Sequence, residues 1–132
     1  LQEHNIPVDE RLISRGSPDE LGGEAAMTEL LSRGQQMTAV VCYNDSMAAG
    51  ALSVLSDNGI DVPQDLSLVG FDDVLISRYL RPRLTTVRYP IIAMATQAAE
   101  LAIALAKGGP LPQTTHMFSP TLVRRHSVRT ID

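Results

Sequence analysis

Two kinds of hydrophobic pattern alternate along the chain. Longer stretches have apolar residues every three or four positions, as in amphipathic helices, and short, nearly continuous apolar runs separate them. The short runs predict strands, and they lie at Arg11–Ser14, Thr38–Tyr43, Leu66–Phe71, Leu84–Tyr89 and Met117–Arg124. The runs at Thr38–Tyr43 and Leu66–Phe71 hardly alternate, which is typical of strands covered on both faces.

Four helices are expected between these strands. The first has Ser17-Pro18 as its N-cap and first-turn proline, and it stops at Gly34. The second runs from about Asp45 to Asn58, and a third, short helix follows Asp72-Asp73. The fourth extends from Pro90 to Lys107. Strand–helix–strand alternation requires parallel pairing with right-handed crossovers, so the sequence predicts an α/β fold with a doubly wound parallel sheet.

Composition narrows the class of protein. The 132 residues carry a net charge of −4 with Lys107 as the only lysine, which argues against a large nucleic-acid footprint in this segment. The basic stretch Arg78–Arg88 therefore favours a solvated face or a subunit contact. The single cysteine, Cys42, is expected to be a small core residue, and a lone cysteine is consistent with a reducing cytoplasm. No apolar run is long enough to span a bilayer. Because the chain begins at Leu1, it is expected to be a piece of a longer protein.

Polar residues follow three of the predicted strands. Ligands of open parallel sheets bind outside the carboxyl ends of the strands, where Arg15, Asn44, Phe71 and Asp72 are found. An amide donates and accepts, a carboxylate accepts from two hydroxyls, and a phenyl ring covers an apolar sugar face, so this set suits a polyol.

A second role is open to the same positions. Asn44 and Asp72 are also placed as ordinary helix N-caps, and one side chain can fill both roles. Asp45 and Asp73, one position deeper into their helices, are expected to be caps or partners of the helix dipole.

The sequence gives no support to an enzyme, a cofactor or a metal site. It contains no Gly-rich phosphate loop and no nucleophile elbow. Asp72-Asp73 imitates the acidic pair of a phosphotransfer receiver, but the only lysine lies at a helix end before glycines. The histidines, His4, His116 and His126, lack metal-ligand spacing.

Four longer motifs carry a family resemblance. They read YNDSMAAGA at Tyr43–Ala51, VPQDLSLVGFDD at Val62–Asp73, LTTV at Leu84–Val87 and TLVRR at Thr121–Arg125. In this order and spacing they resemble the lactose/galactose-repressor (LacI/GalR) family of bacterial transcriptional regulators, from about Gly16 to Val128. Such proteins have a two-lobed core related to periplasmic sugar-binding proteins, preceded by a DNA-binding helix-turn-helix that this sequence does not contain.

The resemblance assigns roles to individual residues and segments. Asn44 and Asp72 match the family's effector-contacting Asn and Asp, whereas two family aromatic positions fall at Pro18 and Ile91. It implies a carboxy-terminal lobe at 1–89, a helix and connection of the other lobe at 90–119, and a final crossover strand and tail at 120–132. Family members pair through segments that match Asp19–Glu24, Ala48–Ser53 and Ile76–Arg81.

The function implied is that of a cytoplasmic, sugar-responsive repressor and not of an enzyme. A monosaccharide of the galactose type would change the operator affinity of the intact dimer. The small residues Ala48–Ala51 support pairing independently, since they permit close approach of another helix. The alternative is a periplasmic-type sugar-binding protein that serves transport. In either case the helix at Pro90–Lys107 lacks its usual cover, and is expected to pack on another copy, fold back or fray.

Overall fold

A four-stranded mixed sheet forms the centre of the fold. The computed structural model describes residues 6–110 and 115–130, so the expectation about His4 and part of the 90–119 connection lie outside the described residues. The strand order is β1-β2-β3-β4, where β1 is Ala39–Val41, β2 Ser67–Phe71, β3 Thr85–Arg88 and β4 Thr121–Val123. The first three strands are parallel and β4 runs antiparallel to β3, which confirms an α/β fold.

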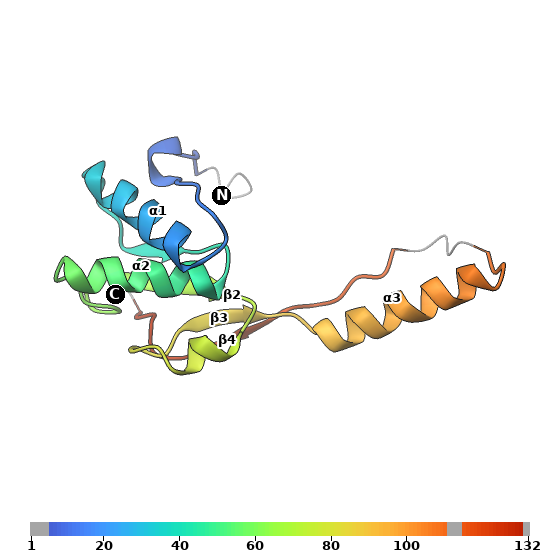
Figure 1. The fold of residues 1–132 in the computed structure, drawn as a ribbon. Helices are drawn as coiled ribbons and strands as arrows, with labels where there is room; N and C mark the ends of the chain where they lie inside the picture. Colours follow the sequence, from blue (N-terminus) through green and yellow to red (C-terminus); the bar gives the residue numbers. More distant parts are fainter. Residues whose placement is uncertain (1–5, 111–114, 131–132) are drawn as a thin grey trace.

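Two helices pack on one another beside the sheet (Figure 1). They are α1, Glu20–Ser32, and α2, Asp45–Asp57. The N-cap of α1 is Asp19, whose Oδ1 accepts a hydrogen bond from the Gly22 N–H at 2.7 Å. The expected cap at Ser17 is therefore wrong, because the Asp19 carboxylate brings a full negative charge to the helix start.

The hydrophobic core lies between α1, α2 and the sheet. It comprises Met27, Leu30, Ala48, Ala51, Leu55, Leu66, Leu68 and Leu84. The two helices approach so closely that a Cβ on Gly50 would overlap the carbonyl oxygen of Glu20, and one on Gly23 that of Met47. The small residues of α2 therefore serve contact with α1 of the same chain. This removes the sequence argument that they indicate a second copy.

The first predicted strand is not a strand. The start of the predicted run Arg11–Ser14 instead belongs to a 3₁₀ helix, η2, which spans Glu10–Leu12 and is capped by Asp9. The Arg33 guanidinium donates to the carbonyls of Arg11 and Ile13 at 2.9 and 2.7 Å, and so takes acceptors that a sheet ladder needs. β1 is left at the sheet edge with Val41 77% exposed, so the expectation that this strand is covered on both faces is wrong.

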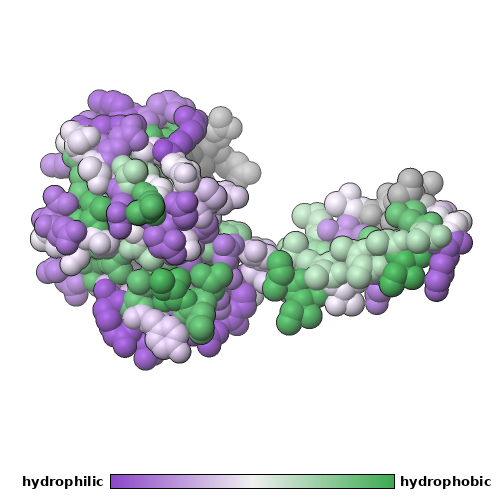
Figure 2. All heavy atoms as spheres, viewed as in Figure 1, coloured by the Kyte–Doolittle hydropathy of each residue, from purple (hydrophilic) through white to green (hydrophobic). Residues whose placement is uncertain are grey.

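The fourth predicted helix, α3, is present at Ile91–Ala106 and projects away from the rest of the chain (Figure 1). None of its residues is buried, and Figure 2 shows apolar side chains along much of its visible surface. The short third helix is the 3₁₀ helix η3, Leu75–Arg78. No helix among the described residues has the length and apolar character needed to cross a membrane.

Candidate functional site

An open groove lies where β2 and β3 end and α3 begins. Its volume is about 770 Å³, and we call it the aromatic groove; its lining is Tyr43, Phe71, Asp72, Tyr89, Met94, His116, Phe118 and Pro120. The Phe71 and Tyr89 rings stack with centroids 5.7 Å apart and planes 28° apart. Asp72 is the acidic residue of this lining, so the groove combines apolar ring faces with a hydrogen-bond acceptor.

A second hollow shares Tyr43 with the aromatic groove. It measures about 410 Å³ and is lined by Ser14, Arg15, Gly16, Pro18, Tyr43 and Met47. Of the residues expected at a site, Phe71 and Asp72 thus meet in the aromatic groove, whereas Arg15 lies in the second hollow. Tyr43, which lines both, was not among the sequence candidates.

Asn44 is engaged as a helix cap. Its Oδ1 accepts from the Met47 N–H at 2.8 Å, and its Nδ2 donates to the Pro18 carbonyl at 2.9 Å. The capping alternative is therefore confirmed. One N–H and one lone pair of the amide stay open to a ligand, so capping does not exclude the effector role.

The aromatic lining was only partly foreseen. Pro18 and Ile91 stand at the two positions where the family has aromatic residues, and neither carries an aromatic ring. Tyr43 and Tyr89 supply aromatic rings instead, and each is the last residue of a predicted apolar run. The rule that ligands bind at strand ends, applied to the last residues of the second and fourth predicted strands, points to both.

The Asp72 carboxylate is held at the groove by its backbone and by Tyr89. Its φ is 106°, and its N–H donates to the Val87 carbonyl at 2.9 Å. The negative charge of Asp72 raises the pKa of Tyr89, aided by burial and by a hydrogen bond between the two side chains. The Tyr89 hydroxyl therefore stays protonated beside Asp72.

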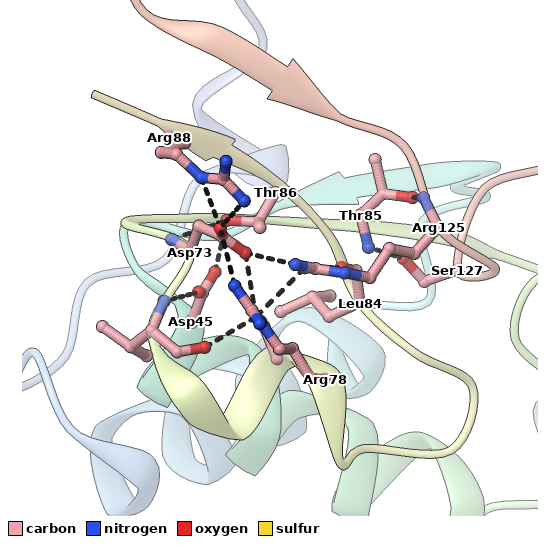
Figure 3. A network of polar contacts seen from close by, with 11 residues as sticks. Asp45, Asp73, Arg78, Leu84, Thr85, Thr86, Arg88, Arg125 and Ser127 are labelled. Atoms are coloured by element: carbon pink, nitrogen blue, oxygen red, sulfur yellow. Dashed lines mark hydrogen bonds and ion pairs between the residues drawn. The ribbon is translucent and has the colours of Figure 1, made fainter. Parts of the chain in front are cut away.

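Asp73 is the centre of an ion-pair network (Figure 3). Its side chain, only 2% exposed, pairs with Arg125 and Arg88, and Arg78 lies 4.0 Å away. Burial alone would raise the pKa of Asp73, but hydrogen bonds from Arg125 and Arg88 outweigh it and lower that pKa. The expectation of a helix cap is wrong here, because η3 has Val74 as its N-cap and no side-chain capping bond.

Asp45 is a buried carboxylate at the first position of α2, as expected for a partner of the helix dipole. It accepts from the Val74 N–H at 2.8 Å and from the Thr86 hydroxyl at 2.5 Å. Burial raises its pKa against the effect of these two hydrogen bonds. A Cβ on Gly70 would overlap Asp45 Oδ1, so the glycine of the VGFDD motif makes room for this side chain.

The described residues offer no cluster of His, Cys, Asp and Glu that could hold a metal ion. Cys42 packs against the core, which confirms the structural role expected for it. Burial raises the pKa of its thiol to about 11, so it stays protonated at neutral pH.

Comparison with known proteins places this architecture in a family. The model of the periplasmic binding protein-like domain matches residues 1–128. The chain is 71% identical over 130 residues to the HTH-type transcriptional regulator GalR of Escherichia coli, covering 98% of this chain and 38% of that protein. It is 59% identical over 128 residues to GalS of Salmonella typhimurium, covering 97% of this chain and 38% of the relative. The chain is a periplasmic binding protein-like domain of the LacI/GalR family.

Solved structures of the family agree with this assignment. The Escherichia coli transcriptional repressor AscG matches with a TM-score of 0.86 at 33% identity, covering 98% of this chain and 47% of the other. A transcriptional regulator CelR–cellobiose complex matches with a TM-score of 0.86 at 33% identity, covering 96% of this chain and 39% of the other. The relatives are transcriptional regulators and not enzymes, and this chain spans 38% of the length of GalR and 47% of the solved AscG chain.

Proposed function

We propose that this chain is the effector-binding and dimerisation portion of a sugar-responsive, cytoplasmic repressor, and that the aromatic groove takes a monosaccharide of the galactose type. The single observation that carries the proposal is the Asp72 carboxylate beside the stacked Phe71 and Tyr89 rings in that groove. An ionised carboxylate accepts from two sugar hydroxyls, and the rings cover the apolar face of a pyranose. The high identity to GalR supports galactose over other sugars.

Further contacts come from outside the groove. Asn44 supplies the free N–H and lone pair of its amide, and Arg15 a guanidinium from the second hollow. Residues 1–89 form the carboxy-terminal lobe, residues 90–119 are the helix and connection of a second lobe whose remainder comes from the rest of the protein, and residues 120–132 are the final crossover strand and tail. The sugar favours one lobe arrangement over the other, and thereby changes the geometry that a helix-turn-helix presents to operator DNA.

The test is a titration of full-length Asp72→Ala with D-galactose by calorimetry. Loss of a charged acceptor costs on the order of 1.5–3 kcal/mol of binding free energy, while operator binding without sugar stays at the wild-type level. Asp57→Ala, which removes an exposed carboxylate at the far end of α2, is the matched control and keeps full affinity. Unchanged galactose affinity in Asp72→Ala refutes the assignment.

Pairing of two copies is the second part of the proposal. Two of the three expected segments present exposed apolar side chains: Leu21 in Asp19–Glu24 is 74% exposed, and Tyr79 in Ile76–Arg81 is 68% exposed. Leu75, directly before the latter segment, is 66% exposed, whereas the small residues of Ala48–Ser53 serve the contact with α1. Light scattering at micromolar concentration should give twice the chain mass of 14.3 kDa. Leu75→Arg should give the single mass, and a monomeric wild-type chain would count against pairing.

A further inference from the structure

The turn after β2 places two neighbouring carboxylates in different surroundings. Asp72 lines the aromatic groove, whereas Asp73 is buried among arginines. Both residues have positive φ, 106° and 54°, a region that side chains other than glycine rarely occupy. Two such residues in succession persist only where the surrounding structure over-determines them.

The side-chain ion pairs that constrain this turn belong to Asp73; the backbone N–H groups of Asp72 and Val74 add bonds to the Val87 carbonyl and to Asp45. Arg125 donates to the Asp73 carboxylate, and its other nitrogen donates to the Ser77 hydroxyl at 3.0 Å and to the Leu84 carbonyl at 2.8 Å. Arg88 donates from Nε to Asp73 Oδ2 at 2.6 Å. By contrast, the backbone N–H of Asp73 has a long contact of 3.4 Å with the Thr86 hydroxyl.

The two arginines come from the segments that lead toward the other lobe. Arg88 is the last residue of β3, directly before Tyr89 of the groove, and Arg125 follows β4 by two positions. In Figure 3 both side chains converge on Asp73, Arg88 from β3 and Arg125 from the segment after β4. Two nitrogens of Arg88 approach Asp73 Oδ2 and one nitrogen of Arg125 approaches Oδ1, so each carboxylate oxygen is held by a guanidinium of its own.

We propose that Asp73 is a positioning residue for effector binding: its ion pairs with Arg88 and Arg125 hold the turn so that the Asp72 carboxylate faces the groove. This inference rests on the proposed function of Asp72. The ion pairs also couple sugar binding to the two crossover segments. A shift of β3 or β4 moves Arg88 or Arg125, and these arginines hold the turn that carries Asp72. Asp73 touches no sugar and acts only through Asp72.

A double-mutant cycle in the full-length protein tests this, with D-galactose affinity measured by calorimetry. Asp73→Asn alone should weaken binding by about tenfold, a change of ~1.4 kcal/mol. Added to Asp72→Ala, the same substitution should cause almost no further loss, since its effect passes through Asp72. A purely structural role predicts the same factor in both backgrounds, or no loss at all, and either result overturns the inference.

A milder variant keeps the test decisive if Asp73→Asn fails to fold. Arg88→Gln removes one of the two ion pairs at a side chain that is 51% exposed, and it should weaken binding only when Asp72 is present. Arg124→Gln, at an exposed arginine beside Arg125, is the matched control and leaves affinity unchanged. Wild-type affinity in Asp72→Ala would refute the proposed function itself, whereas wild-type affinity in Arg88→Gln alone overturns only the role of the ion pairs.

Discussion

The carboxylate of Asp45 accepts a hydrogen bond from the Thr86 hydroxyl at 2.5 Å, and both residues are fully buried. The two lie 41 positions apart, one at the start of α2 and the other in the middle of β3. Because the same carboxylate also accepts from the Val74 N–H, a single side chain connects a helix, a strand and the turn that carries Asp72.

Thr86→Val should therefore destabilise the fold, since it keeps the shape of the side chain but leaves a buried carboxylate short of a donor. The expected loss is about 1–3 kcal/mol of unfolding free energy, measured by urea denaturation. Thr121→Val, at an exposed position of β4, should stay within about 0.5 kcal/mol of wild type. Equal midpoints for the two variants would contradict the prediction.

The pH dependence of stability should report on Asp73. Its pKa is lower in the folded protein than the ordinary value of 3.8, so its ion pairs stabilise the fold above that value and are lost as the pH falls. The difference in unfolding free energy between wild type and Asp73→Asn should have its largest value near neutral pH and should decrease below about pH 4. Asp45, whose pKa shifts the other way, is present in both proteins and largely cancels. A difference that is constant with pH would show that the ion pairs contribute nothing.

The packing of α1 on α2 should be intolerant of one added methyl group. Gly50→Ala places a Cβ on the backbone carbonyl of Glu20, which cannot move without displacing α1. We expect a loss of about 1–3 kcal/mol in thermal or urea denaturation. Ala49→Ser, next to it and partly exposed, is the control that should cost little. Full stability in Gly50→Ala would mean that the helices can separate slightly without penalty.

Much of the fold followed from the sequence because its signals are local. The apolar runs at β2 and β3 and the glycines that end α1 and α2 located those elements to within a few residues. What the sequence did not show depends on partners distant along the chain. Arg33 competes for the carbonyls of the first apolar run, and Gly50 faces α1 instead of another copy. The sequence predicts a helix cap or dipole partner at Asp73, because the arginines that neutralise it lie 15 and 52 positions away.

Asn44 offers a way to separate capping from ligand binding. Asn44→Asp keeps an oxygen that can accept from the Met47 N–H, whereas Asn44→Ala loses the cap at a cost of about 1 kcal/mol of unfolding free energy. If the amide also contacts the sugar, both variants should weaken D-galactose binding by about tenfold. Both lose the bond to the Pro18 carbonyl, and Asn44→Ala, which loses the cap as well, should lose the more stability. Galactose affinity at the wild-type level in Asn44→Asp would restrict Asn44 to its capping role.

The last prediction concerns α3, whose 16 residues stand clear of the core. An isolated helix of this length is marginal in water, so it needs cover to persist. Ile91, Ile92 and Ile103 are 57%, 80% and 55% exposed, and we expect packing of this helix on a second copy to cover them.

Hydrogen exchange on this 132-residue chain distinguishes the outcomes for α3. Packing on a second copy predicts amide protection across 91–106 at high concentration that disappears on dilution to monomer. Amides of α2 serve as the internal control, because Leu55 and Ala51 are buried within one chain and their protection should not depend on concentration. Protection of α3 that survives dilution would mean that the helix folds back on its own sheet. No protection at either concentration would mean that the helix frays. Either result contradicts pairing through α3.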